Sequence, residues 1–150
     1  MIFIIYVECT DLGPKQLIHG FKTKNITING RKIRYFQGGT RGPEILLIHG
    51  CMIDSSKLSW GLVAPMLAEN MRVTAVDLPG FGGSESPSGS INISTYTAFI
   101  DRFLSEIGID KTAIAGISLG GQIAMAMSAF YPDRVSRIYL IASGGFSQSK

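Results

Sequence analysis

The stretch Gly116-Ile117-Ser118-Leu119-Gly120-Gly121 lies between an apolar run, residues 112–115, and a helix-like stretch, residues 122–131. This order predicts a strand, a tight turn and a helix, with Ser118 at the apex of the turn. A turn of this kind, the nucleophile elbow, lifts a serine side chain above the edge of a sheet, where it can act in covalent catalysis. Ser118 is therefore a candidate nucleophile.

The residues around Ser118 fit the geometry that an elbow needs. Strand and helix approach closely there, so the positions two before and two after the serine must be small, and they are Gly116 and Gly120, with Gly121 next to them. The backbone N–H of Leu119, at the start of the helix, would supply one half of an oxyanion hole. A glycine-rich turn with a capping serine is the structural alternative, because the motif is short.

A second motif is the candidate for the other half of the oxyanion hole. His49-Gly50 closes a continuous apolar run, residues 45–48, that is typical of a strand buried on both faces. A loop there can bring the backbone N–H of Cys51 to the same oxyanion. We expect the His49 side chain to be structural, since it sits on the oxyanion side, and Cys51 to act through its backbone.

The third motif is Asp-Leu-Pro-Gly-Phe-Gly-Gly-Ser, residues 77–84, which follows another short apolar run, residues 72–76. Its glycines permit a tight loop over the carboxyl edge of the sheet. Partner ligands that would let Asp77 hold a metal are not apparent, so a structural role is predicted for it, with no metal and no cofactor.

The order of the predicted elements indicates an α/β fold, a mostly parallel sheet flanked by helices. Asn29-Gly30 separates two strand-like runs and is a strong hairpin signal. From residue 44 onward strands and helices alternate, which implies parallel strands. Ser94 or Thr95 is the expected N-cap of the middle helix, with Gly108 as its stop. The predicted strands are 25–28, 31–36, 45–48, 72–76, 113–117 and 135–142, and the helices are 60–67, 94–107 and 119–131.

Composition narrows the function classes. With 150 residues, 45% hydrophobic and 17% charged, the chain is expected to be globular, with an N-terminal extension over residues 1–20 and one domain over residues 21–150. The net charge is +3, but the cations are scattered, so nucleic-acid binding is not expected. Two cysteines, no evident signal peptide and no membrane-spanning run favour a cytoplasmic protein.

Together, His49-Gly50, residues 77–84, residues 116–121 and Tyr-Pro-Asp-Arg-Val at 131–135 resemble the α/β-hydrolase family, from about Phe21 to Ala142. The resemblance implies an eight-stranded, mostly parallel sheet and Ser-Asp/Glu-His catalysis through an acyl-enzyme. It implies that Ser118 is the nucleophile and that small ester-like or acyl molecules are the substrates. Serine at this position disfavours the haloalkane dehalogenases and epoxide hydrolases, which use aspartate, and leaves esterase, lipase and C–C hydrolase branches open.

The chain departs from the family pattern in one large respect. The acid and the histidine of the family follow later strands and have no counterpart before Lys150, so we expect strands one to six of a truncated core, inactive alone. The alternative is a non-catalytic binding domain that self-associates through an exposed last strand, residues 135–141. A split enzyme completed by a second chain is a further alternative, for which no residue argues.

Overall fold

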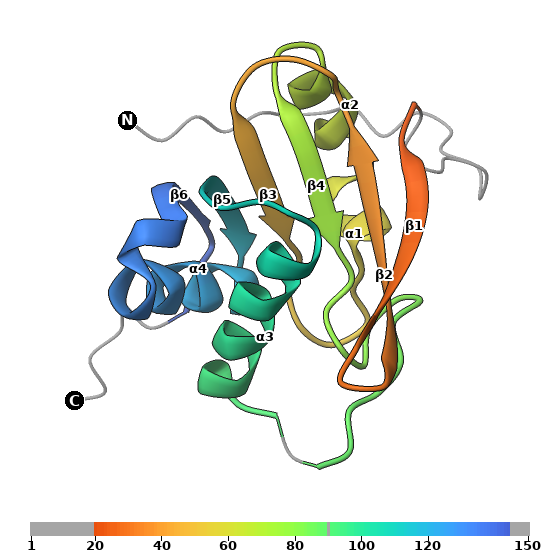
Figure 1. Cartoon of the computed structure of the whole chain (residues 1–150), viewed down its shortest axis with the longest axis vertical. Coiled ribbons are helices and arrows are strands. Elements are labelled where there is room, and N and C mark those ends of the chain that lie inside the picture. The colour runs from red at the N-terminus through yellow and green to blue at the C-terminus, as the bar shows by residue number, and fades with distance from the viewer. Residues whose placement is uncertain (1–19, 90, 145–150) are drawn as a thin grey trace.

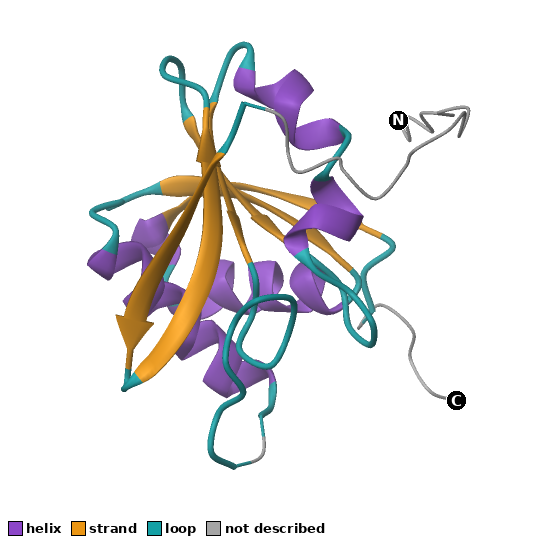
Figure 2. Ribbon diagram, turned by 90° about the vertical axis from the view of Figure 1, so that its right-hand side faces the viewer, coloured by secondary structure: helices purple, strands orange, loops and turns teal. Residues whose placement is uncertain are grey.

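The computed structural model describes residues 20–89 and 91–144 of the chain. Apart from Gly20, the predicted N-terminal extension lies outside the described residues. Figure 1 shows the arrangement of the elements, and Figure 2 shows the same molecule after a quarter turn, with helices on both sides of the sheet. None of the helices within the described ranges is both long and apolar enough to cross a membrane.

The first two strands form the predicted hairpin. β1 (Lys22–Ile28) pairs antiparallel with β2 (Arg31–Gly38). The two turn residues, Asn29 and Gly30, both have positive φ angles, 50° and 73°. Positive φ at both central residues is the requirement of the hairpin turn that Asn-Gly favours, so the turn prediction is confirmed.

The remaining strands make the sheet mostly parallel. β3 (Glu44–Ile48), β4 (Arg72–Val76), β5 (Thr112–Ile117) and β6 (Val135–Ile141) join the hairpin in the order β1-β2-β4-β3-β5-β6. β3 pairs in parallel with β4 and β5, and β5 pairs in parallel with β6, while β2 is antiparallel to β4. The α/β prediction, with six strands, is therefore confirmed.

Helices cover both faces of this sheet (Figure 2). One apolar core lies beneath α3 (Ile93–Glu106) and α4 (Leu119–Phe130), and a second lies beneath α1 (Ser56–Trp60) and α2 (Val63–Ala68). A short 3₁₀ turn, η1 (Pro132–Arg134), leads from α4 into β6. The strands between the two cores are buried on both faces, which explains their uninterrupted apolar sequences.

Two helix starts differ from the sequence prediction. The helix expected at residues 60–67 begins earlier, at Ser56, and is divided into α1 and α2 around Gly61. The N-cap of α3 is Asn92, not Ser94 or Thr95, because the Asn92 side chain accepts the N–H of Thr95 while the Thr95 hydroxyl accepts the N–H of Asn92. This reciprocal pair is a capping box, and with it α3 begins at Ile93, one residue before the predicted start.

The topology places the candidate residues at one edge. β3 is central, and the chain passes first to β4 on one side and then to β5 on the other. Such a reversal leaves a crevice at the carboxyl ends of the strands. His49, Asp77 and Ser118 directly follow β3, β4 and β5, so all three lie along this edge.

Candidate active site

Ser118 occupies a strained turn between β5 and α4. Its backbone angles are φ 51° and ψ −109°, a combination that residues with a Cβ rarely adopt. The Ser118 N–H donates to the carbonyl of Ile141 in β6 at 3.0 Å, and the Ser118 carbonyl accepts from Gly121 and Gln122 at 3.0 and 3.2 Å. The main chain is thus fixed on both sides of the serine, which holds the unusual angles in place.

The turn leaves no room for a side chain at its two glycines, Gly116 and Gly120. A Cβ added to Gly116 would overlap the backbone of Gly120, and one added to Gly120 would overlap the carbonyl of Ile48 at the end of β3. The start of α4 therefore lies directly against β5 and β3. This close approach is the packing that the sequence analysis expected from the small residues of the elbow.

Two backbone amides near Ser118 have no acceptor within the described part of the chain. One belongs to Cys51, and the other to Leu119, the first residue of α4, where a helix leaves its N–H groups unpaired. Gly50 brings the first amide close, since a Cβ built on Gly50 would lie 3.7 Å from the Ser118 Cβ. Both amides lie beside one serine, and neither is used elsewhere among those residues.

The His49 side chain is engaged inside the protein. It is fully buried, its Nδ1 lies 2.8 Å from the Gly50 carbonyl, and the Leu78 N–H donates to its Nε2 at 3.0 Å. Because Nε2 accepts, the proton of the neutral ring sits on Nδ1. Burial lowers the pKa of His49, which favours this neutral form. The ring joins the loop after β3 to the loop after β4.

Asp77 connects three segments from the same edge. Its fully buried carboxylate accepts Nε and Nη2 of Arg34 at 2.6 Å, the N–H of Ser56 at 2.9 Å and the N–H of Gly83 at 2.9 Å. The Ser84 hydroxyl donates to the Asp77 carbonyl at 2.7 Å. β2, the start of α1 and the loop after β4 therefore share one anion, and the contacts are those of a structural residue.

Asp54 is a residue that the sequence analysis did not single out. Its carboxylate accepts the N–H of Gly50, the N–H of Ser55 and the hydroxyl of Ser59, each at 2.7 Å. The sequence signal was Asp-Ser-Ser ahead of an apolar helix, which is typical of a helix start. The bond back to Gly50 could not be read from that signal.

Comparison with known proteins now adds to this geometry. Residues 43–149 match the model of the family described as "alpha/beta hydrolase fold". The chain belongs to the α/β-hydrolase fold family. The mostly parallel sheet with flanking helices agrees with that membership.

Individual relatives have varied functions. An uncharacterized protein of Mycobacterium tuberculosis is 35% identical over 122 residues, 81% of this chain and 35% of that protein. 2-Hydroxymuconate semialdehyde hydrolase of a Pseudomonas species is 35% identical over 108 residues, 71% of this chain and 38% of the enzyme. The solved structure of a bacterial membrane phospholipase A has a TM-score of 0.81 at 32% identity, covering 89% of this chain and 43% of that one. This α/β-hydrolase chain thus spans well under half of each.

The described part of this α/β-hydrolase contains one histidine, His49, which is buried with both ring nitrogens hydrogen-bonded to the backbone. Within the same residues, no group of three or more His, Cys, Asp and Glu side chains is placed to hold a metal ion. The Cys51 side chain is exposed, with a free thiol, and Cys9 lies outside the described ranges. The site as described consists of a serine, two amides and the network that positions them.

Apolar side chains are exposed beside the site. The loop after β3 carries Met52 and Ile53, which are 84% and 95% exposed. α1 and α2 continue the surface with an outward row spaced four residues apart, opposite the buried Trp60 and Ala64. The members of this apolar row are Leu58, Leu62 and Met66. A helix that is apolar on both sides is unusual on a protein surface.

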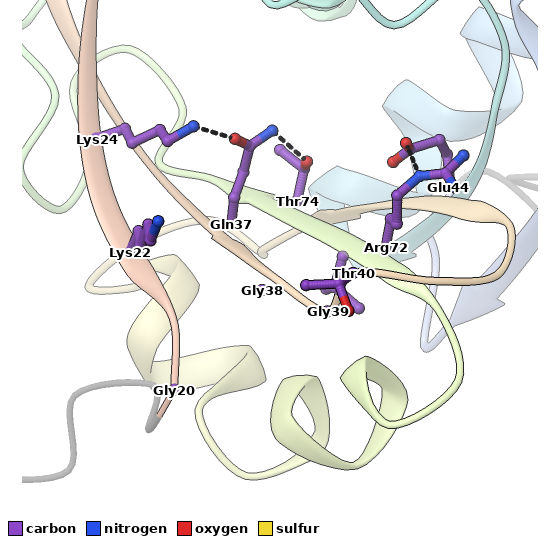
Figure 3. Close-up of a pocket in the computed structure, with 11 residues that line it drawn as sticks. Gly20, Lys22, Lys24, Gln37, Gly38, Gly39, Thr40, Glu44, Arg72 and Thr74 are labelled. Carbon is purple, nitrogen blue, oxygen red and sulfur yellow. Dashed lines mark hydrogen bonds and ion pairs between the residues drawn. The ribbon is translucent and has the colours of Figure 1, made fainter.

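A pocket lies at the other edge of the sheet in this α/β-hydrolase (Figure 3). It has a volume of about 310 Å³ and lies where β1 begins, β2 ends and β3 and β4 start. Lys24 donates to Gln37 at 2.7 Å, and Gln37 donates to Thr74 at 3.2 Å. Since Ser118 follows the carboxyl end of β5, this pocket is separate from the candidate active site.

Proposed function

We propose that this chain carries the nucleophile half of a serine hydrolase that acts on small ester-like or related acyl compounds. In this proposal the Ser118 oxygen attacks the carbonyl carbon, and the N–H groups of Cys51 and Leu119 bind the oxygen that becomes negative. The bond from the carbonyl carbon to the leaving group then breaks, the leaving group takes up a proton, and water releases the acyl group from Ser118 as a carboxylic acid. The observation that carries the proposal is the strained turn at Ser118, held beside two amides without acceptors in the described chain.

In this proposal the groups have separate tasks. The elbow presents the Ser118 oxygen, and the N-terminus of α4 favours negative charge at the same place. Removing one oxyanion donor typically costs about 10²- to 10³-fold in kcat, so the two amides account for a large part of such catalysis. A base for the Ser118 proton is absent from the described residues, because His49 is buried with both ring nitrogens engaged.

The names of the relatives suggest the class of substrate. One relative is named as a hydrolase of 2-hydroxymuconate semialdehyde, and one structural neighbour as a phospholipase. Both names are compatible with a serine that forms an acyl-enzyme, at a C–C bond or at an ester. We infer an acyl compound as the common feature, and we leave the leaving group open.

The test uses the purified 150-residue chain. Because the described residues supply no base for the Ser118 proton, imidazole is added as an external base. A fluorophosphonate probe should then modify Ser118, as located by peptide mass mapping, in the wild type and in the control variant Ser94→Ala, which alters an exposed serine. Ser118→Ala should abolish the modification. Labelling that is equal in Ser118→Ala, or spread over surface serines, would refute Ser118 as the nucleophile.

A parallel assay measures p-nitrophenyl ester hydrolysis. Without a base and an acid, the residual rate should be low, since oxyanion binding alone typically retains only about 10³- to 10⁴-fold over water in a complete fold. Robust turnover that Ser118→Ala removes would contradict our expectation that the chain alone lacks the base.

A non-catalytic role is the second candidate, and one observation favours it. Among the described strands, β6 pairs only with β5, and its side chains Tyr139 and Ile141 are 41% and 44% exposed. A free strand edge with apolar side chains can pair with a second chain. Light scattering should then show concentration-dependent dimers, and a monodisperse monomer at high concentration would count against this role.

A further inference from the structure

Asp54 anchors the loop that follows β3. Its Oδ2 accepts both the Gly50 N–H and the Ser59 hydroxyl, and its Oδ1 accepts the Ser55 N–H. Gly50 begins the loop and Ser59 lies in α1, so a single carboxylate ties the start of the loop to the helix after it. Within the described residues Asp54 makes no ion pair, and three donors therefore satisfy its charge.

This anchoring selects which amide is free. Because the Gly50 N–H is used by Asp54, it is not available to bind a substrate oxygen, whereas the next amide, that of Cys51, has no acceptor among the described residues. The loop also passes between the carboxylate and the nucleophile: a Cβ on Gly50 would lie 3.0 Å from Asp54 Oδ2 and 3.7 Å from the Ser118 Cβ. Any shift of this peptide changes where the Cys51 N–H points.

The loop needs such an anchor. Met52 has a φ of 67°, a left-handed conformation that is uncommon for a long side chain. Strained residues of this kind persist only where their surroundings fix them. The fixed points are Gly50 and Ser55, at the two ends of the loop, and Asp54 holds both.

Helix capping does not explain the arrangement. Ser55 is already the N-cap of α1, since its side chain accepts the N–H of Leu58. The Asp54 bond to Gly50 lies outside the helix and adds nothing to the cap. It acts on the loop that carries the Cys51 amide.

We propose that Asp54 is a positioning residue whose carboxylate holds the Gly50 peptide so that the Cys51 N–H faces Ser118. This inference rests on the proposed function, because it gives the Cys51 amide its task. Asp54 itself touches neither the nucleophile nor, in this proposal, the substrate. Its effect is to make the oxyanion donor ready before the substrate arrives.

A spectroscopic readout tests the anchoring without any chemistry. In the ¹⁵N-labelled 150-residue chain, the amide proton of Gly50 should resonate downfield, as expected of a short bond to a carboxylate. Asp54→Ala should move it upfield and shift the Cys51 amide as well, whereas the control Asp110→Asn, at an exposed carboxylate, should leave both unchanged. A Gly50 amide that is indifferent to Asp54→Ala would overturn the proposal.

A kinetic readout then separates positioning from a purely structural role. At a temperature where each variant is folded, the maximal rate of fluorophosphonate labelling at Ser118 should fall about 10- to 100-fold in Asp54→Ala, with unchanged half-saturation by the probe. The labelling rate of Asp54→Asn, which keeps one carbonyl acceptor, should lie between those of the wild type and the alanine variant. This variant replaces Asp54→Ala in the test if the alanine variant does not fold.

The two proposals fail in different ways. If the folded Asp54→Ala variant labels Ser118 at the wild-type rate, the positioning role is wrong and Ser118 remains the nucleophile. If the wild type is not labelled at Ser118 even with imidazole present as a base, the proposed function is wrong, and the oxyanion task of the Cys51 amide is wrong with it.

Discussion

Replacing Ser118 by glycine should make the folded chain more stable than replacing it by alanine. Both substitutions delete the hydroxyl, but only glycine removes the Cβ that makes φ 51° and ψ −109° unfavourable. Strain of this kind is worth about 1–3 kcal/mol. Glycine also gives the unfolded chain more freedom, which costs about 0.5–1 kcal/mol. The difference in unfolding free energy should therefore be about 1 kcal/mol in favour of glycine, and at most about 2.5 kcal/mol.

Trp60 provides the assay. It is the single tryptophan of the chain and is 3% exposed in the core beneath α1, so its fluorescence reports loss of that core. Urea unfolding of the glycine and alanine variants, analysed with a common slope, gives the difference directly.

The control is Ala98→Gly at an exposed position inside α3, where glycine should instead be less stable than alanine by about 1 kcal/mol. If glycine is also the less stable residue at position 118, the turn stores no strain and the reasoning is refuted.

Two further predictions concern the network along the carboxyl edge. Asp77→Ala should lower the unfolding free energy by about 3 kcal/mol, because it leaves the Arg34 charge and two amides without their acceptor. The control Asp110→Ala, at an exposed carboxylate, should change the unfolding free energy by less than about 0.5 kcal/mol. Equal urea midpoints for these two variants would contradict this prediction. His49 has a pKa lowered by burial, so below its ordinary value of 6.5 the unfolded chain takes up a proton that the folded chain refuses. The contribution of neutral His49 to the unfolding free energy is fully present above pH 6.5. It is lost as pH falls towards the lowered pKa of His49, at up to about 1.4 kcal/mol per pH unit. In His49→Asn the unfolding free energy should therefore change less between pH 7.5 and 5.5 than in the wild type, as measured by urea unfolding. If the two profiles run parallel, His49 does not titrate in this way.

Local signals were sufficient for most of the fold. Residues 72–76 were predicted as a strand from five residues, and β4 has these bounds. The Asn29-Gly30 turn was predictable because its residues must adopt positive φ. The start of α1 was not, because the sequence shows apolar spacing only from Trp60 onward. The Ser56 N–H is held by Asp77, 21 residues away along the chain, and no local pattern indicates that bond.

The candidate site divides in the same way. Ser118, Gly116 and Gly120 were predicted, because an elbow requires specific residue types at fixed spacing within six positions. The contacts of Asp54 were not predicted, because they depend on a loop that folds back so that a carboxylate meets the amide four residues earlier. Contacts of this kind follow from the conformation of Met52 and the position of α1, which a short motif does not encode.

The apolar row on α1 and α2 has a practical consequence for anyone who screens this protein by dye-based thermal melts. Leu58, Leu62 and Met66, together with Met52 and Ile53, offer the native state a surface to which environment-sensitive dyes adsorb. Such melts should therefore start from a high baseline of fluorescence. A high initial signal from this chain is thus a property of its folded form, and it should not be read as misfolding.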